Sequence, residues 1–237
     1  VFLVYGYMNR GMHEGRQGIS LCRYDHSGAI EERFFIPAKE SFDQMKLDIE
    51  KLCYYSEKGM LYFFRGETIF GVDLSSNENI VVADGLREGT YAISSDSRKV
   101  AWQEGADDGG TVIHLFDLAT GENREIRAKE GERIQCLGFV QDDFVYGLSG
   151  EDSMWILNGR QESQPMYALE IVDSDLQLQT RYEKEGSYVA DVEVENARIH
   201  VRRYGRYGEH DYAFMDNDTI VCNTAVEEPY MEGIGRF

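Results

Sequence analysis

The sequence predicts an antiparallel all-β fold built from repeated four-stranded modules. The chain is rich in aromatic residues, with 15 Tyr and 12 Phe, and contains only 3 Pro. Short runs of β-branched and aromatic residues alternate with polar ones, and clusters of Gly, Asp and Ser separate these runs at turns. The 237 residues suffice for one large β domain or for two small ones. We expect a single domain over residues 1–237, and the alternative is two stacked β domains without ring closure.

The clearest module covers residues 90–134. Its strand-like runs are TYAI, KVAWQ, TVIHLFDL and NREIRA, and the turns between them are SSDSRK, EGADDGG and ATGE. Residues 52–89 repeat this order, and their VDLSSNEN falls where the next module has FDLATGEN. Self-similarity of this kind is the mark of a repeat architecture.

The same order of strands continues on both sides. Residues 135–186 form a module with a longer outer part, in which MWILN is expected as the third strand, and residues 187–237 form another. Residues 1–51 read as a module that lacks its first strand. About five modules of roughly 40–50 residues match the period of propeller blades. We therefore predict a β-propeller of about five four-stranded blades, complete or as a fragment of a larger propeller.

One segment has helical periodicity. In SFDQMKLDIEKL, Ser41 is a candidate N-cap, and Phe42, Met45, Ile49 and Leu52 fall near one face. This helix would connect the first two modules and pack against them.

The two ends of the chain leave alternatives open. The chain begins without Met in VFLVYGYM, which already reads as a strand, so we expect a part of a longer protein. The tail AVEEPYMEGIGRF could supply the missing strand of the first module and close a ring, or it could lead to further blades.

The third module resembles the WD40-like repeat of TolB-type bacterial propellers. The residues that carry the resemblance are Ser95, Asp96, Lys99, Val100, Ala101, Asp117, Leu118, Thr120, Gly121 and Glu122. The chain departs from that pattern at Ser97 and Arg98, where a glycine is usual, and it lacks a proline after the serine. The resemblance implies a binding scaffold or an enzyme-associated domain, in an extracytoplasmic or cell-surface setting in a bacterium.

Charge restricts the possible partners. The chain has 24 Lys and Arg against 43 Asp and Glu, a formal net charge of −19, which repels nucleic acids and anionic lipid surfaces. Protein, peptide and glycan partners remain. No stretch approaches the ~20 apolar residues of a membrane helix. The cysteines Cys22, Cys53, Cys136 and Cys222 lie too far apart for a zinc motif and read as structural thiols.

A ligand face is predicted where the loops between second and third strands, and between blades, gather. Two loop segments each combine Arg, His, Glu and Gly, and a third segment carries carboxylates. The candidate residues are Arg10, His13, Arg16, Glu104, Asp107, Asp108, Arg203, Tyr204, Arg206, Tyr207 and His210. Guanidinium groups bind carboxylates or phosphates, and tyrosines stack on sugars or contact proteins. The alternative is that these are solvated hairpins; the carboxylates could also help hold Ca²⁺.

Catalytic motifs are missing from the sequence. It contains no GxSxG, HExxH, Walker or GxGxxG pattern, and its five histidines lack metal-ligand spacing. Among 43 carboxylates the sequence cannot nominate a glycosidase pair. We therefore expect a non-catalytic binding or scaffold domain without a cofactor or metal. The alternative is a carbohydrate-active domain, or one that gates a hydrolase.

Overall fold

The computed structural model describes residues 2–24, 27–76, 78–106, 109–151, 155–157, 160–162, 165–195 and 197–222. Within these residues the fold is antiparallel β, with a single helix, so the predicted all-β class is confirmed. The tail, for which ring closure and a connection to further blades were the two alternatives, lies outside the described residues.

The strands fall into five consecutive groups. The first group is β1 (Phe2–Tyr7), β2 (Gln17–Tyr24) and β3 (Ile30–Pro37). The second is β4 (Cys53–Tyr55), β5 (Met60–Arg65), β6 (Thr68–Asp73) and β7 (Asn79–Ala83). The third is β8 (Tyr91–Ile93), β9 (Lys99–Ala106), β10 (Gly109–Asp117) and β11 (Glu122–Arg127). The fourth is β12 (Glu132–Val140), β13 (Asp143–Gly150), β16 (Met166–Val172) and β17 (Leu178–Glu183), and the fifth is β18 (Ser187–Glu195), β19 (Arg198–Arg206) and β20 (Tyr212–Val221).

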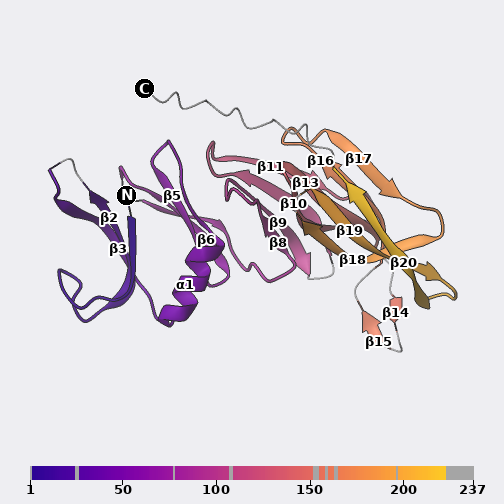
Figure 1. Ribbon diagram of the computed structural model, residues 1–237, viewed down its shortest axis with the longest axis horizontal. Coiled ribbons are helices and arrows are strands. Elements are labelled where there is room, and N and C mark those ends of the chain that lie inside the picture. The colour runs from indigo at the N-terminus through magenta and orange to yellow at the C-terminus, as the bar shows by residue number, and fades with distance from the viewer. Residues whose placement is uncertain are drawn as a thin grey trace, which may run out of the picture.

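The first two groups are separate sheets, and the last three form one sheet of eleven strands. Two single residue pairs join the groups of the large sheet: Gly110 with Ile134, and Met166 with Val189. The groups follow one another along the long axis, so the first and fifth groups lie at opposite ends of the molecule (Figure 1).

The fourth group differs from the expected order of strands. The segment expected as its third strand belongs instead to a separate hairpin, β14 (Trp155–Leu157) with β15 (Arg160–Glu162). The third position in the sheet is taken by β16, which pairs with β13. The run MYALEIV of β16 has seven residues, against three in WIL, and is largely buried, as expected for a strand inside the sheet.

Each junction between neighbouring groups has its own apolar core. Each core contains at least one fully buried side chain from each of the two groups that meet there. In order along the chain, examples of such pairs are Leu21 with Phe63, Phe64 with Leu118, Ile113 with Phe144, and Leu169 with Ile199. These cores hold successive groups face to face, as in stacked repeats.

The helix α1 (Phe42–Lys51) connects the first two groups. Ser41 caps it as predicted, accepting a hydrogen bond from the Gln44 amide, and Met45 is buried. Phe42 is not in the core as expected, because its side chain is 54% exposed and its ring stacks on Tyr5. The helix thus places an aromatic ring at the surface beside β1.

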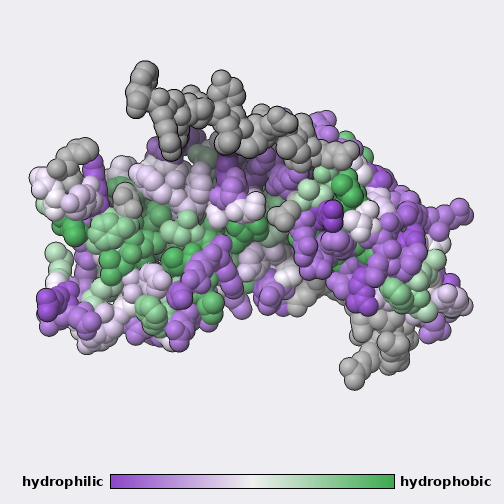
Figure 2. Space-filling view, in the orientation of Figure 1, coloured by the Kyte–Doolittle hydropathy of each residue, from purple (hydrophilic) through white to green (hydrophobic). Residues whose placement is uncertain are grey.

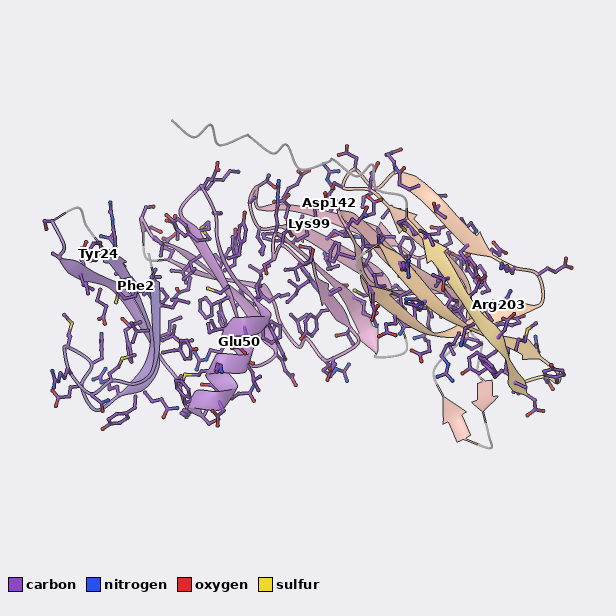
Figure 3. All side chains as sticks on the ribbon, in the orientation of Figure 1. Phe2, Tyr24, Glu50, Lys99, Asp142 and Arg203 are labelled. Atoms are coloured by element: carbon purple, nitrogen blue, oxygen red, sulfur yellow. The ribbon has the colours of Figure 1, made fainter. Side chains whose placement is uncertain are left out.

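Cationic side chains bridge the outer ends of the junctions. Lys58 Nζ donates to the Thr120 carbonyl at 2.7 Å, from the second group to the third. Lys99 Nζ donates to the Asp142 carbonyl at 2.9 Å and to Ser174 Oγ at 2.8 Å, from the third group to the fourth. Figure 3 shows Lys99 and Asp142 side by side at this junction.

Replacing Lys99 with methionine should lower the free energy of unfolding by about 1–2 kcal/mol, because two charge-assisted hydrogen bonds between groups are lost. The side chain of Lys99 is only 15% exposed, so water replaces these bonds poorly. Lys46→Met is the matched control: Lys46 pairs with Glu50 on the exposed face of α1 and should change stability by less than about 0.5 kcal/mol. Urea denaturation measures both, and equal effects would contradict the account.

The junction between the fourth and fifth groups should be acid-sensitive. Hydrogen bonds from Lys184 and from the Tyr182 hydroxyl hold the pKa of Asp218 at about 2, well below its usual value. Since the folded pKa is the lower one, this stabilisation is complete above about pH 4 and is lost as the pH falls through about 2. Asp218→Asn should therefore be less stable than the parent at pH 7, with a difference that shrinks between pH 4 and 2. A difference that stays constant with pH would rule out this contribution.

Candidate functional site

The predicted site residues lie in two loops at opposite ends of the molecule. Arg10, His13 and Arg16 belong to the β1–β2 loop of the first group, whereas Arg206 and Tyr207 lie at the β19–β20 turn of the fifth. These groups are far apart along the long axis (Figure 1). The structure therefore does not bring the two similar segments together into one site.

The arginines of the β19–β20 hairpin are engaged within the hairpin itself. Arg203 Nε donates to Asp216 Oδ1 at 2.6 Å, and its Nη2 donates to Asp216 Oδ2. Arg206 Nε donates to the Gly208 carbonyl at 2.8 Å and holds the turn in place. Both guanidinium groups thus use part of their donors to stabilise the hairpin.

Of the three aromatic and histidine residues predicted here as ligand groups, one is buried and two are exposed. Tyr204 is 5% exposed and packs edge-on against Phe214, so its ring is not available for the predicted stacking on a ligand. Tyr207 and His210 are exposed, Tyr207 to 75%.

The carboxylate segment gives no metal site among the described residues. Asp107 and Asp108 lie outside that part of the chain. Glu104 Oε1 lies 2.7 Å from His114 Nε2, and the His114 ring stacks on Trp102 at 4.9 Å. Glu104 therefore orients a histidine on the sheet surface. No group of three His, Cys, Asp or Glu side chains that could hold a metal is found in the described structure.

The β1–β2 loop is fixed to the outer face of its own sheet. The His13 ring stacks on Phe35 with centroids 4.0 Å apart, and His13 Nε2 lies 2.8 Å from Glu32 Oε1. Ser20 Oγ donates to the other Glu32 oxygen at 2.6 Å. The Phe35 ring fits beneath His13 only because residue 18 is a glycine: a Cβ at Gly18 would lie 2.5 Å from that ring. His13, predicted as a ligand residue, holds the loop in place.

The fixed loop presents an exposed surface of mixed character. Met12 is 88% exposed and Tyr7 61% exposed, and Arg10 and Arg16 are exposed beside them in the loop. Among the described residues neither of these guanidinium groups forms an ion pair. The ring of Phe42 adjoins the same strand, because a Cβ at Gly6 would contact it at 3.2 Å. We call Tyr7, Arg10, Met12, Arg16 and Phe42 the loop platform.

The electrostatic setting of the loop platform differs from that of the rest of the chain. Residues 1–37 contain four arginines and four carboxylates, so the net charge of −19 arises entirely from the remaining residues. An acidic partner is repelled over most of the surface, and that repulsion is weakest at the first group. Figure 2 shows hydrophobic residues gathered over the first two groups, whereas the fifth group is largely hydrophilic.

The sequence reasoning missed a second surface, the outer face of the fifth group. Asp191, Glu193 and Glu195 of β18 lie beside Arg202 and His200 of β19, with Arg202 Nη1 3.4 Å from Asp191 Oδ2. Two open depressions of 400 and 470 Å³ lie over this face. The alternation in DVEVE and RIHVR could have revealed it, because it places charges on one face and valines on the other.

A small cavity of 90 Å³ lies at the junction of the third and fourth groups, lined by Phe116, Asp117, Arg124 and neighbouring residues. Arg124 Nη1 is occupied by the Ser174 carbonyl at 2.6 Å. Burial raises the pKa of Asp117, but hydrogen bonds from the Thr120 amide and from Arg98 outweigh it, so the pKa is lowered overall. This cavity holds charged groups that already serve the junction.

The four cysteines form no disulfide. Cys22 and Cys136 are buried, as expected of structural thiols, and Cys53 is exposed. Burial raises the pKa of Cys136 far above its usual range, so this sulfur stays protonated and is a poor nucleophile.

Solved structures similar to the chain are β-propellers, the class named by the sequence resemblance. TolB from Acinetobacter baumannii is 13% identical, with a TM-score of 0.36 over 83% of this chain and 45% of that one. The β-propeller domain of the Trilobed protease from Pyrococcus furiosus, described as having an open velcro topology, is 15% identical, with a TM-score of 0.40 over 92% and 68%. The RRP9 WD40 repeats are 9% identical, with a TM-score of 0.36 over 69% and 50%.

The chain thus spans about half the length of the TolB and RRP9 chains. No protein-family model and no curated protein matches the sequence. No helix in the described part of the chain is long and apolar enough to cross a membrane.

Proposed function

We propose that this chain is a non-catalytic binding domain that engages a protein or peptide through the loop platform. The observation that carries the proposal is an exposed set of aromatic, methionine and arginine side chains on a loop that is held rigid. Tyr, Phe, Met and Arg are enriched at protein interfaces, and Tyr and Arg are among the residues that most often dominate the binding energy.

The β1–β2 loop is held in one conformation, which favours binding. The His13–Phe35 stack and the His13–Glu32 contact fix the loop before any partner arrives. Little conformational entropy is then lost on binding, which is the main benefit of a preorganised site. The equivalent hairpin of the fifth group is also ordered, but its arginines are already paired.

The wider setting is part of the same proposal. In this proposal the five groups are the blades of a propeller domain over residues 1–237, which is part of a larger bacterial envelope or surface protein. Four apolar junction cores between consecutive groups support such a stacked arrangement. An extracytoplasmic location is the setting in which we expect the partner.

The alternative of a carbohydrate-active enzyme finds less support. A glycosidase needs a carboxylic acid with a raised pKa to protonate its leaving group. The pKa values of Asp117 and Asp218, which line two of the described hollows, are lowered by hydrogen bonds from neighbouring groups. Burial, together with the nearby Asp173, raises the pKa of Asp143, but Asp143 lines neither hollow. Asp117 and Asp218 are therefore suited to stay ionised at junctions between groups.

The test is selection of peptides from a random displayed library on the immobilised chain. We expect the enriched peptides to be acidic with apolar residues, and Met12→Ala with Tyr7→Ala to weaken their binding at least 10-fold at an unchanged melting temperature. The matched control is Tyr207→Ala with Arg206→Ala in the other hairpin, which should leave binding intact. Loss of binding in the control instead, or enrichment of basic peptides, would overturn the proposal. A neutral glycan, the remaining ligand class, would bind independently of the arginines.

A further inference from the structure

Building on the proposed function, we infer that the partner binds as an extended strand, which adds to the open edge of β1 and places acidic residues over the loop platform. Among the described residues β1 pairs with β2 alone. In the second to fourth groups the corresponding strand has a neighbour on that side: β4 beside β5, β8 beside β9 and β12 beside β13. Within the described residues, the first group therefore lacks the strand that these groups have on that side.

The sequence of β1 lacks the features that keep edge strands apart. Natural edges carry charges, proline or bulges, which prevent pairing with another chain. The described edge strands β3, β11, β17 and β20 all contain charged residues. The six residues FLVYGY of β1 contain no charge and no proline, and their pairing with β2 has no bulge.

The backbone groups that would accept the added strand can be assigned. Met8 N donates to the Arg16 carbonyl, and hydrogen-bonded pairs alternate along an antiparallel ladder. Val4 and Gly6 therefore face β2, while Leu3 and Tyr5 turn their N–H and C=O groups to the open edge. Main-chain bonds of this kind supply affinity in strand addition, and side-chain contacts supply specificity.

Charge favours an acidic partner strand, and the antiparallel pairing of the described strands gives its expected direction. The C-terminal end of β1 runs into the loop with Arg10 and Arg16. In an antiparallel strand the N-terminal residues would lie over these two arginines, so carboxylates are expected there. Other described edge strands are uncharged as well. Of these, β4, β8 and β14 have only three residues each. The longer one, β7, lies between Glu78 and Asp84, which repel such a partner. The described surface thus favours β1 for an acidic strand.

The experiment uses a labelled peptide, Glu-Glu-Thr-Val-Thr-Val-Thr-Val, with its reversed sequence as the control. We expect the first peptide to bind at least 10-fold more tightly than the reversed one in fluorescence anisotropy. N-methylation of the three valines, or of the three threonines, blocks one edge of the peptide, and at least one of these versions should lose binding 10-fold. Leu3→Pro should do the same, and Val81→Pro in β7 should not.

Hydrogen exchange distinguishes the possible occupants. We expect the amides of Leu3 and Tyr5 to exchange freely in the chain alone and at least 10-fold more slowly with the peptide. Slow exchange in the chain alone at every concentration would show that its own segment fills the edge, and slow exchange accompanied by dimer mass would show a second copy. Either result overturns the inference, as does binding weaker than about 1 mM.

The failure of this inference is separable from that of the proposed function. If both N-methylated peptides bind as well as the parent peptide, and binding still depends on Met12 and Tyr7, the loop platform stands as a binding surface and the added strand is refuted. If binding is independent of Met12 and Tyr7, the proposed function itself fails.

Discussion

Replacing Gly18 with alanine is expected to destabilise the chain by about 3 kcal/mol and to release the β1–β2 loop. A Cβ at this position would lie 2.3 Å from the Ile36 carbonyl oxygen and 2.5 Å from the Phe35 ring. The first contact is with backbone, so β3 itself must move, and the ring that supports His13 moves with it. The melting temperature should fall by about 6–12 °C for a domain of this size.

The matched control for this substitution is Gly59→Ala. Gly59 has a φ of 83° and no atom within 4 Å of its ideal Cβ. That variant should cost about 1–2 kcal/mol, from the left-handed backbone alone, and leave the loop unchanged. Hydrogen exchange of residues 8–16 separates the two cases, because it should accelerate in Gly18→Ala only. Unchanged exchange in Gly18→Ala would mean that the His13 contacts do not fix the loop.

Reversing both charges of the loop platform, in Arg10→Glu with Arg16→Glu, should weaken the binding of selected acidic peptides about 30-fold, or about 2 kcal/mol. Two attractions become repulsions in a chain that is already acidic. Both side chains are exposed and free of ion pairs within the described residues, so the melting temperature should change little. Isothermal titration at two salt concentrations measures the effect.

The salt dependence provides the internal control. Raising the salt from 0.05 to 0.5 M should weaken peptide binding to the parent chain, because exposed charges are screened. The difference in affinity between the parent chain and the double variant should therefore become smaller. Arg202→Glu with Arg198→Glu makes the same charge change on the outer face of the fifth group and should have little effect. Equal losses in both double variants would indicate a general charge effect and contradict a local site.

Local patterns in the sequence were sufficient to predict much of the fold. Alternation and turn residues gave the strands of the third group, and the Ser41 cap gave the start of α1. They failed where two apolar runs compete for one position, as β14 and β16 do in the fourth group. The longer buried run wins there, and its advantage depends on tertiary contacts with β13 that no local pattern contains.

The candidate site was less predictable than the fold. Residue type alone marked Arg203 as a ligand group, but the β19–β20 register, shifted by a bulge next to Arg203, places Asp216 opposite it. Residue type also predicted His13 as a ligand group, but in the structure its ring stacks on Phe35 and contacts Glu32. Phe42 was expected in the core, and its exposure depends on how α1 packs against β1. Pairings between distant segments of this kind require the structure.

The most direct test of the central claim is hydrogen exchange of the chain with and without a selected acidic peptide, read by mass spectrometry at peptide resolution. The loop platform account predicts slower exchange in residues 2–16 and at the start of α1, with the fifth group unaffected. Protection confined to β18–β20 or to the β19–β20 turn, with none in residues 2–16, would contradict it.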